Sequence, residues 1–157
     1  MADLPGWSIY TIYTGILAII LSVAVPRIKL KKLAIYGIIF GAVADIFWIL
    51  LIGVLGVARY INYGPFGFLG LPFFPPIAWT IYFIIYFYFL PRKNFWPYVF
   101  AFIAAIYSIV FSNVLNNLGI FKWTISNVWV PFFIYVIWHV GVTWIFLKLK
   151  KSKWIPE

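Results

Sequence analysis

The stretch that decides the fold is residues 33–57, LAIYGIIFGAVADIFWILLIGVLGV, in which Asp45 is the single charged residue. It follows the basic segment RIKLKK at residues 27–32. An α-helix needs about 20 predominantly apolar residues to cross a hydrocarbon core of about 30 Å. The stretch therefore predicts a membrane-spanning helix.

Four further apolar runs lie on either side of this stretch, at residues 7–25, 72–90, 95–115 and 128–147. Pro26 and Pro91 directly follow two of them, as expected where a helix ends. The runs are too long for barrel strands, which show alternating segments of about 10 residues. We predict an all-α fold in which residues 1–157 form one domain, a single bundle of five transmembrane helices.

The composition excludes a soluble enzyme. Hydrophobic residues make up 66% of the chain and charged residues 10%, whereas soluble domains have about 45–50% and about 25%. With no cysteine and one histidine, thiolate and multi-histidine metal sites are impossible. No nucleophile elbow, zinc-protease or phosphate-loop motif is found. We therefore expect no catalytic residue, no metal and no cofactor.

The basic residues indicate the orientation in the membrane. All twelve except Arg59 and Lys122 fall in three segments, at residues 26–32, at 91–94 and after Leu147. Five spans place these segments on one side, so the positive-inside rule predicts an outside N-terminus and a cytoplasmic C-terminus. We expect a multi-pass protein of a prokaryotic cytoplasmic membrane. The clusters, with a net charge of +9, are suited to anionic lipid head groups rather than to nucleic acid.

Two ionisable side chains fall at membrane depth, Asp45 and His139. A charge there costs at least about 2.5–3.5 kcal/mol on insertion scales, so such residues are candidates for function. Tyr135, His139 and Thr143 recur at four-residue spacing and form a polar stripe. Counting from the cytoplasmic ends predicts that Asp45 meets this stripe. Whether such a site acts as a proton relay or fixes helix packing is left open.

Small residues predict which helix faces pack together. Gly37, Gly41 and Gly56 share a helical arc with Asp45, so another helix should approach there. The first helix offers a similar stripe, with Thr11, Gly15, Ala18 and Ser22. The third run is dominated by aromatic rings and lacks such a stripe, so we expect it to be peripheral, facing lipid or a partner subunit.

Three short motifs carry a resemblance to a known family. They are Gly41-Ala42-Val43-Ala44-Asp45, the aromatic run that ends at Leu90-Pro91, and residues 118–123 (LGIFKW) leading to Trp129. With them the chain resembles a family of uncharacterised five-helix membrane proteins of spore-forming Firmicutes. The resemblance implies a helical bundle and no activity. Size and tryptophan content are also similar to the TspO translocators, but their motifs are not matched in position.

These observations lead to two functional hypotheses. The first is a non-enzymatic membrane protein that assembles as a homo-oligomer or as an accessory component with a membrane-protein partner; short loops and the basic cytoplasmic face favour it. The alternative is a small transporter, or a proton- or ion-conducting protein, that uses Asp45 and His139. A lipid-processing enzyme is a third alternative, which lacks a recognisable nucleophile or metal site.

Overall fold

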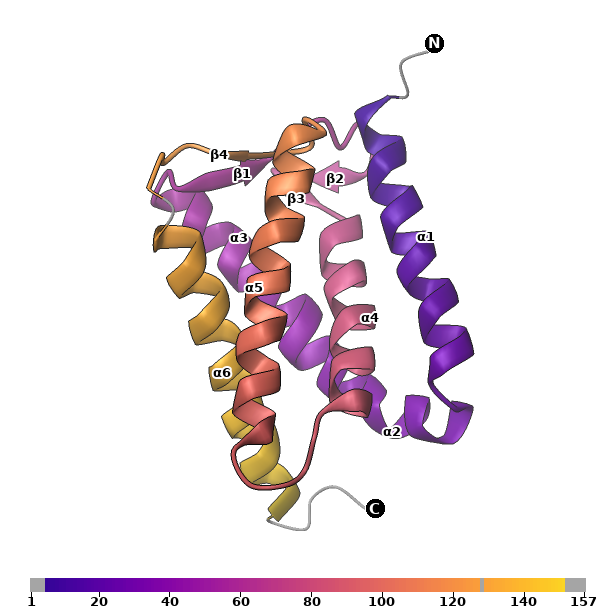
Figure 1. Cartoon of the computed structure of the whole chain (residues 1–157). Helices are drawn as coiled ribbons and strands as arrows, with labels where there is room; N and C mark the ends of the chain where they lie inside the picture. Colours follow the sequence, from indigo (N-terminus) through magenta and orange to yellow (C-terminus); the bar gives the residue numbers. More distant parts are fainter. Residues whose placement is uncertain (1–4, 128, 152–157) are drawn as a thin grey trace. The chain divides into compact units, whose positions relative to one another are not determined.

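The computed structural model describes residues 5–127 and 129–151, and most of them are helical. The helices are α1 (Gly6–Ala24), α2 (Arg27–Gly37), the π-helical segment η1 (Ile38–Val43), α3 (Ala44–Val54), α4 (Phe74–Phe89), α5 (Trp96–Asn117) and α6 (Trp129–Lys151) (Figure 1). The segments α2, η1 and α3 join into one helix of 28 residues, Arg27–Val54.

Four of these helices are long and apolar enough to cross a bilayer: Gly6–Ala24, Arg27–Val54, Trp96–Asn117 and Trp129–Lys151. The chain is therefore a helical membrane protein. The fifth apolar helix, α4, has 16 residues and is shorter than the usual minimum of about 17 residues for a span. Residue 128, the expected start of the last span, lies outside the described residues.

The second helix differs from the expected range of 33–57 at both ends. It begins at Arg27, because Pro26 (φ −59°) is suited to precede a first turn, and long basic side chains can extend from a helix toward the interface. It ends at Val54 because Gly56 adopts a φ of 65°. The Val57 N–H then donates to the Ile52 carbonyl over 2.8 Å, which closes a Schellman-type helix end.

The chain divides into two compact units, and the single domain expected from the sequence stays a prediction. Unit 1 comprises residues 1–89 and 115–124, and unit 2 comprises residues 90–114 and 125–157. Unit 1 contains α1 to α4 and the strands. Unit 2 contains most of α5 and all of α6.

The aromatic helix α4 is the centre of unit 1, where it packs against α1, α2 and η1. Its side chains at Phe83, Tyr86 and Phe87 are buried, and the Phe87 ring meets Phe40 edge-on at 5.7 Å. The expectation of a peripheral third helix was therefore wrong. The small residues Gly37 and Gly41 of the neighbouring helix lie against the Ile84 side chain and the α4 backbone at Trp79 and Thr80, so α4 needs no small-residue stripe of its own.

The small-residue stripe of α1 lies on the surface instead. Thr11, Gly15 and Ser22 are exposed, and a Cβ built on Gly15 meets nothing within 4 Å. The buried face of α1 carries Tyr10 and Thr14. The expectation that Thr11, Gly15 and Ser22 face the interior was therefore wrong for the described chain.

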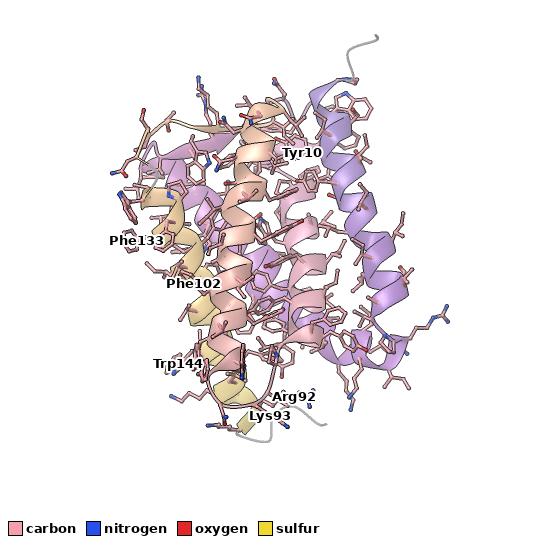
Figure 2. The ribbon with its side chains drawn as sticks, viewed as in Figure 1. Tyr10, Arg92, Lys93, Phe102, Phe133 and Trp144 are labelled. Carbon is pink, nitrogen blue, oxygen red and sulfur yellow. The ribbon has the colours of Figure 1, made fainter. Side chains whose placement is uncertain are left out.

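Two short antiparallel strand pairs lie in unit 1 and were not expected from the sequence. One joins β1 (Ala58–Tyr60) to β4 (Phe121–Trp123), and the other joins β2 (Gly67–Phe68) to β3 (Leu71–Pro72). The Tyr10 hydroxyl lies between the carbonyls of Ile61 and Ile120 and can donate to either. Figure 2 labels Tyr10 beside the strands. The N-terminal part of α1 and the two loops are thus tied together at one end of unit 1.

Removing this hydroxyl should loosen that end of the unit. We expect Tyr10→Phe to lower the free energy of unfolding by about 1–3 kcal/mol, because two carbonyls lose a shared donor in a buried setting. The thermal melting temperature in detergent measures the effect. Tyr107→Phe is the matched control, since the Tyr107 side chain is 67% exposed. Equal melting temperatures of the two variants would contradict the role assigned to Tyr10.

Unit 2 gathers basic residues at one end. The helices α5 and α6 run in opposite directions (Figure 1), so the start of α5 and the end of α6 share an end of the unit. Figure 2 shows Arg92, Lys93 and Trp144 toward that end. The Lys148 ammonium lies over the Trp144 ring, 4.9 Å from its centroid. In unit 1 the basic residues lie in the first turns of α2, at the end of the unit opposite the β1–β4 pair (Figure 1).

Candidate functional site

Asp45 lies in the first turn of α3, in the interior of the long helix Arg27–Val54. Its residue surface is 3% exposed. Among the described residues, the Oδ2 atom is buried and has no hydrogen-bond partner. A carboxyl oxygen at this depth without a partner is unfavourable by several kcal/mol as a rule, because neither water nor protein compensates for its desolvation.

The helix is deformed directly before Asp45. Residues Ile38–Val43 form a π-helical segment inside an otherwise α-helical stretch. Such segments are rare and are frequently found at functional sites. The inserted residue shifts the helix register and directs a side chain that the α-helix would place elsewhere. The distortion therefore places Asp45 out of register with the basic first half of the helix.

Close packing against α4 holds this distorted segment. A Cβ at Gly41 would lie 2.5 Å from the Trp79 carbonyl oxygen and 2.6 Å from the Thr80 nitrogen. A Cβ at Gly37 would lie 2.4 Å from the Ile84 side chain. Both glycines are buried. The backbone of the long helix thus contacts the backbone of α4 at Gly41, one turn before Asp45. This contact fixes the position of the helix turn that bears the carboxyl.

Gly56 differs from the other two glycines. It lies beyond the end of α3, is exposed, and a Cβ there would meet nothing within 4 Å. Its positive φ shows that it serves the helix end described above rather than a helix contact. Gly56 was expected on the packing face because the 3.6-residue periodicity was continued beyond Val54, where the helix ends.

Tyr13 is the polar neighbour of Asp45 that the sequence did not single out. The Tyr13 hydroxyl on α1 interacts electrostatically with the Asp45 carboxyl and with Tyr10. The Tyr10 and Tyr13 rings are 6.0 Å apart. The packing of α1 against α4 could not be read from spacing within either segment.

His139 forms a second polar cluster, within unit 2. Its residue surface is 0% exposed. The Nδ1 atom lies 2.8 Å from the Tyr135 carbonyl oxygen, which can only accept, so Nδ1 carries the hydrogen. The Nε2 atom of the neutral ring then has a lone pair directed at the Ser108 hydroxyl, 3.4 Å away. That hydroxyl has one hydrogen, which it can donate either to Nε2 or to the Ala104 carbonyl, 2.9 Å away.

The other residues of the predicted stripe lie on the same helix. Thr143 is 0% exposed and Tyr135 is 8% exposed. Ser108, across on α5, is the residue of this cluster that sequence reasoning did not place in the site. Its signal was a face of small residues on α5, at Ala101, Ala104, Ala105, Ser108 and Ser112. Asp45 belongs to unit 1 and His139 to unit 2, so their meeting stays a prediction.

Each of the two clusters contains one titratable side chain, Asp45 or His139. No group of three or more His, Cys, Asp or Glu side chains that could hold a metal occurs in residues 5–127 and 129–151. Asp45 is a carboxyl with a free oxygen, and His139 has a basic lone pair close to a hydroxyl. Each can take up one proton, and a carboxylate can also bind a monovalent cation.

Comparison of the chain with models of protein families, with curated proteins and with solved structures finds no match. The resemblance to membrane proteins of spore-forming Firmicutes stays a prediction.

Proposed function

We propose that the chain crosses a prokaryotic cytoplasmic membrane five times, with the N-terminus outside. The β1–β4 pair supports this topology, because it joins the loop before α4 to the loop after α5. If α5 crosses the bilayer, α4 must cross it too for both loops to meet on one side. The 16 residues of α4 measure about 24 Å, and local thinning of the bilayer can accommodate a short span.

The distribution of charge within each unit supports the orientation. In unit 1 the basic turns of α2 lie at the end opposite the strands, and in unit 2 Arg92 and Lys93 share an end with the last turn of α6 (Figure 2). The positive-inside rule assigns these basic ends to the cytoplasm. The strand end, with Arg59 and Lys122, then faces outward.

Cysteine labelling tests the topology, since the chain has no cysteine of its own. In intact cells, we expect Asn62→Cys to react with a membrane-impermeant maleimide, because Asn62 is exposed beside the strands. Lys31→Cys, exposed on α2, should react only after the membrane is opened. The reverse pattern would contradict the orientation, and equal labelling of both in intact cells would contradict the five crossings.

We further propose that the protein is a small proton or cation transporter, or a conducting protein, in which Asp45 is the binding group. The observation that carries this proposal is the buried Oδ2 atom, which no described residue bonds. A carboxyl kept only for architecture would have its acceptors satisfied, as buried polar groups generally have. An ionisable side chain inside a membrane segment is most often functional.

The π-helical segment adds independent support for a binding role. Gly37 and Gly41 keep a distorted, tightly packed stretch directly before Asp45. A binding group needs such a fixed position, whereas a side chain that only fills space does not.

Assembly with a second copy or another membrane protein is the second candidate. The exposed small-residue face of α1, at Thr11, Gly15 and Ser22, favours it, because small residues let helices approach closely in a bilayer. Native mass measurement of the purified protein with bound lipid tests this candidate. A monomeric mass together with proton flux supports transport, whereas a stable oligomer or co-purifying partner without flux supports assembly.

A further inference from the structure

The strand pair β1–β4 places two positive charges opposite each other. Arg59 and Lys122 are cross-strand partners, and both are exposed. Their strand neighbours Ala58 and Phe121 are buried. Because side chains alternate between the faces of a strand, the pair presents one apolar face to unit 1 and one basic face to the surroundings.

Like charges directly opposite each other destabilise a strand pair. The chain has three acidic residues, and the one in the described part, Asp45, is buried in the long helix. Neither Arg59 nor Lys122 has an ion-pair partner among the described residues. The charges are therefore opposed without compensation from residues 5–127 and 129–151.

The surroundings of the pair are typical of a membrane interface. The strands follow the end of α3 and precede the start of α6. The Tyr60 ring packs edge-on against Phe121 at 4.9 Å, and Phe121 packs against Trp123 at 5.0 Å. Tyrosine and tryptophan are enriched at the level of lipid head groups, so Arg59 and Lys122 lie where phosphate groups are found.

We propose that Arg59 and Lys122 together bind the phosphate of an anionic phospholipid in the leaflet at the strand end. The guanidinium binds two phosphate oxygens with parallel N–H groups, and the ammonium acts as a mobile point charge. The negative charge of the lipid phosphate then offsets the repulsion between Arg59 and Lys122, because both side chains bind the same phosphate. This inference rests on the proposed topology only for which leaflet supplies the lipid.

Peptide-resolved hydrogen exchange of the purified chain in detergent tests the binding. We expect phosphatidylglycerol, but not phosphatidylcholine, to slow amide exchange in residues 58–61 and 120–124. At a lipid concentration about ten times the dissociation constant, the protection should be about tenfold. In Arg59→Gln/Lys122→Gln, exchange should already be slower without lipid, because the repulsion is removed, and phosphatidylglycerol should not change it further.

Three controls separate this site from other charges. Arg92→Gln/Lys93→Gln removes the same charge from the other unit and should leave the lipid response of the strands unchanged. Asp3→Asn, in the part of the chain outside the described residues, should do the same. Inorganic phosphate at equal concentration should give no protection.

An unchanged lipid response in Arg59→Gln/Lys122→Gln overturns the site, and full protection by inorganic phosphate overturns the lipid as its source. Neither result bears on Asp45, whose role is read from proton flux.

Discussion

Replacing Gly41 by alanine is expected to destabilise the folded protein by about 1–3 kcal/mol, the usual range for overpacking. The added Cβ would lie 2.5 Å from the Trp79 carbonyl oxygen and 2.6 Å from the Thr80 nitrogen. These are backbone atoms of α4, which cannot rotate away as a side chain can. Gly41→Leu should abolish the folded protein, because a larger side chain forces α4 away from η1.

Gly53 provides the matched control on the same long helix. A Cβ there meets nothing within 4 Å. Gly53→Ala should be neutral or stabilising, since alanine is favoured over glycine by about 1 kcal/mol within a helix. Urea unfolding in mixed micelles, or the melting temperature in detergent, compares the two. Equal stability of Gly41→Ala and Gly53→Ala would show that the long helix does not pack on α4 through Gly41.

Asp45→Asn is expected to abolish proton flux while leaving the protein folded. Asparagine has nearly the same shape but cannot take up a proton, so the helix contact at Gly41 is preserved and the binding group is lost. Proteoliposomes with an internal pH-sensitive dye measure the flux after a potassium diffusion potential is imposed with valinomycin. Wild-type protein should acidify or alkalinise the lumen according to the sign of the potential.

Asp3→Asn is the charge-matched control for this experiment and should retain wild-type flux. Infrared difference spectra separate proton binding from conduction, because a protonated carboxyl has its own stretching band. The band should disappear in Asp45→Asn. Unchanged flux in Asp45→Asn would overturn the transport proposal. Loss of the band with no flux in either protein would limit Asp45 to a structural role and favour assembly.

Much of the helical architecture could be predicted from the sequence because the membrane restricts the solutions. The almost complete absence of charge over residues 7–25 and 33–57, where Asp45 is the single charged residue, indicated long helices, and the structure has α1 and Arg27–Val54 there. Burial of Asp45 and His139 also followed the expectation that ionisable groups in membrane segments avoid lipid. These inferences depend on length and polarity, which are local properties of the chain.

The choice of helix partners could not be predicted, because it depends on complementary shapes in two distant segments. Gly37 and Gly41 indicated a close neighbour but not that the neighbour is the aromatic α4, where Ile84 and the Thr80 backbone lie against them. The exposed Gly15 carries a similar local signal, yet nothing in the described chain packs against it. A small residue indicates that a second helix can pack closely against it, but it does not indicate which helix does so.

The strands and the π-helical segment were missed for a related reason. Three-residue strands such as Ala58–Tyr60 are too short for an alternating pattern, and their stability comes from Tyr10 and from the partner strand. The segment Ile38–Val43 has the composition of an ordinary apolar helix. The segment packs against α4, a neighbour that residues 38–43 do not identify by themselves.

The β1–β4 pair also has a consequence for how the protein is made. On the ribosome, Ala58–Tyr60 are synthesised well before Phe121–Trp123, with α4 and most of α5 between them. During that interval β1 has no partner, and the Tyr10 hydroxyl has only the Ile61 carbonyl of its two acceptors. The β1–β4 pair can form only after α4, α5 and β4 have left the ribosome. A nascent chain that stops before residue 121 therefore lacks this pair, and the translocon or a membrane protease could distinguish it from the finished protein.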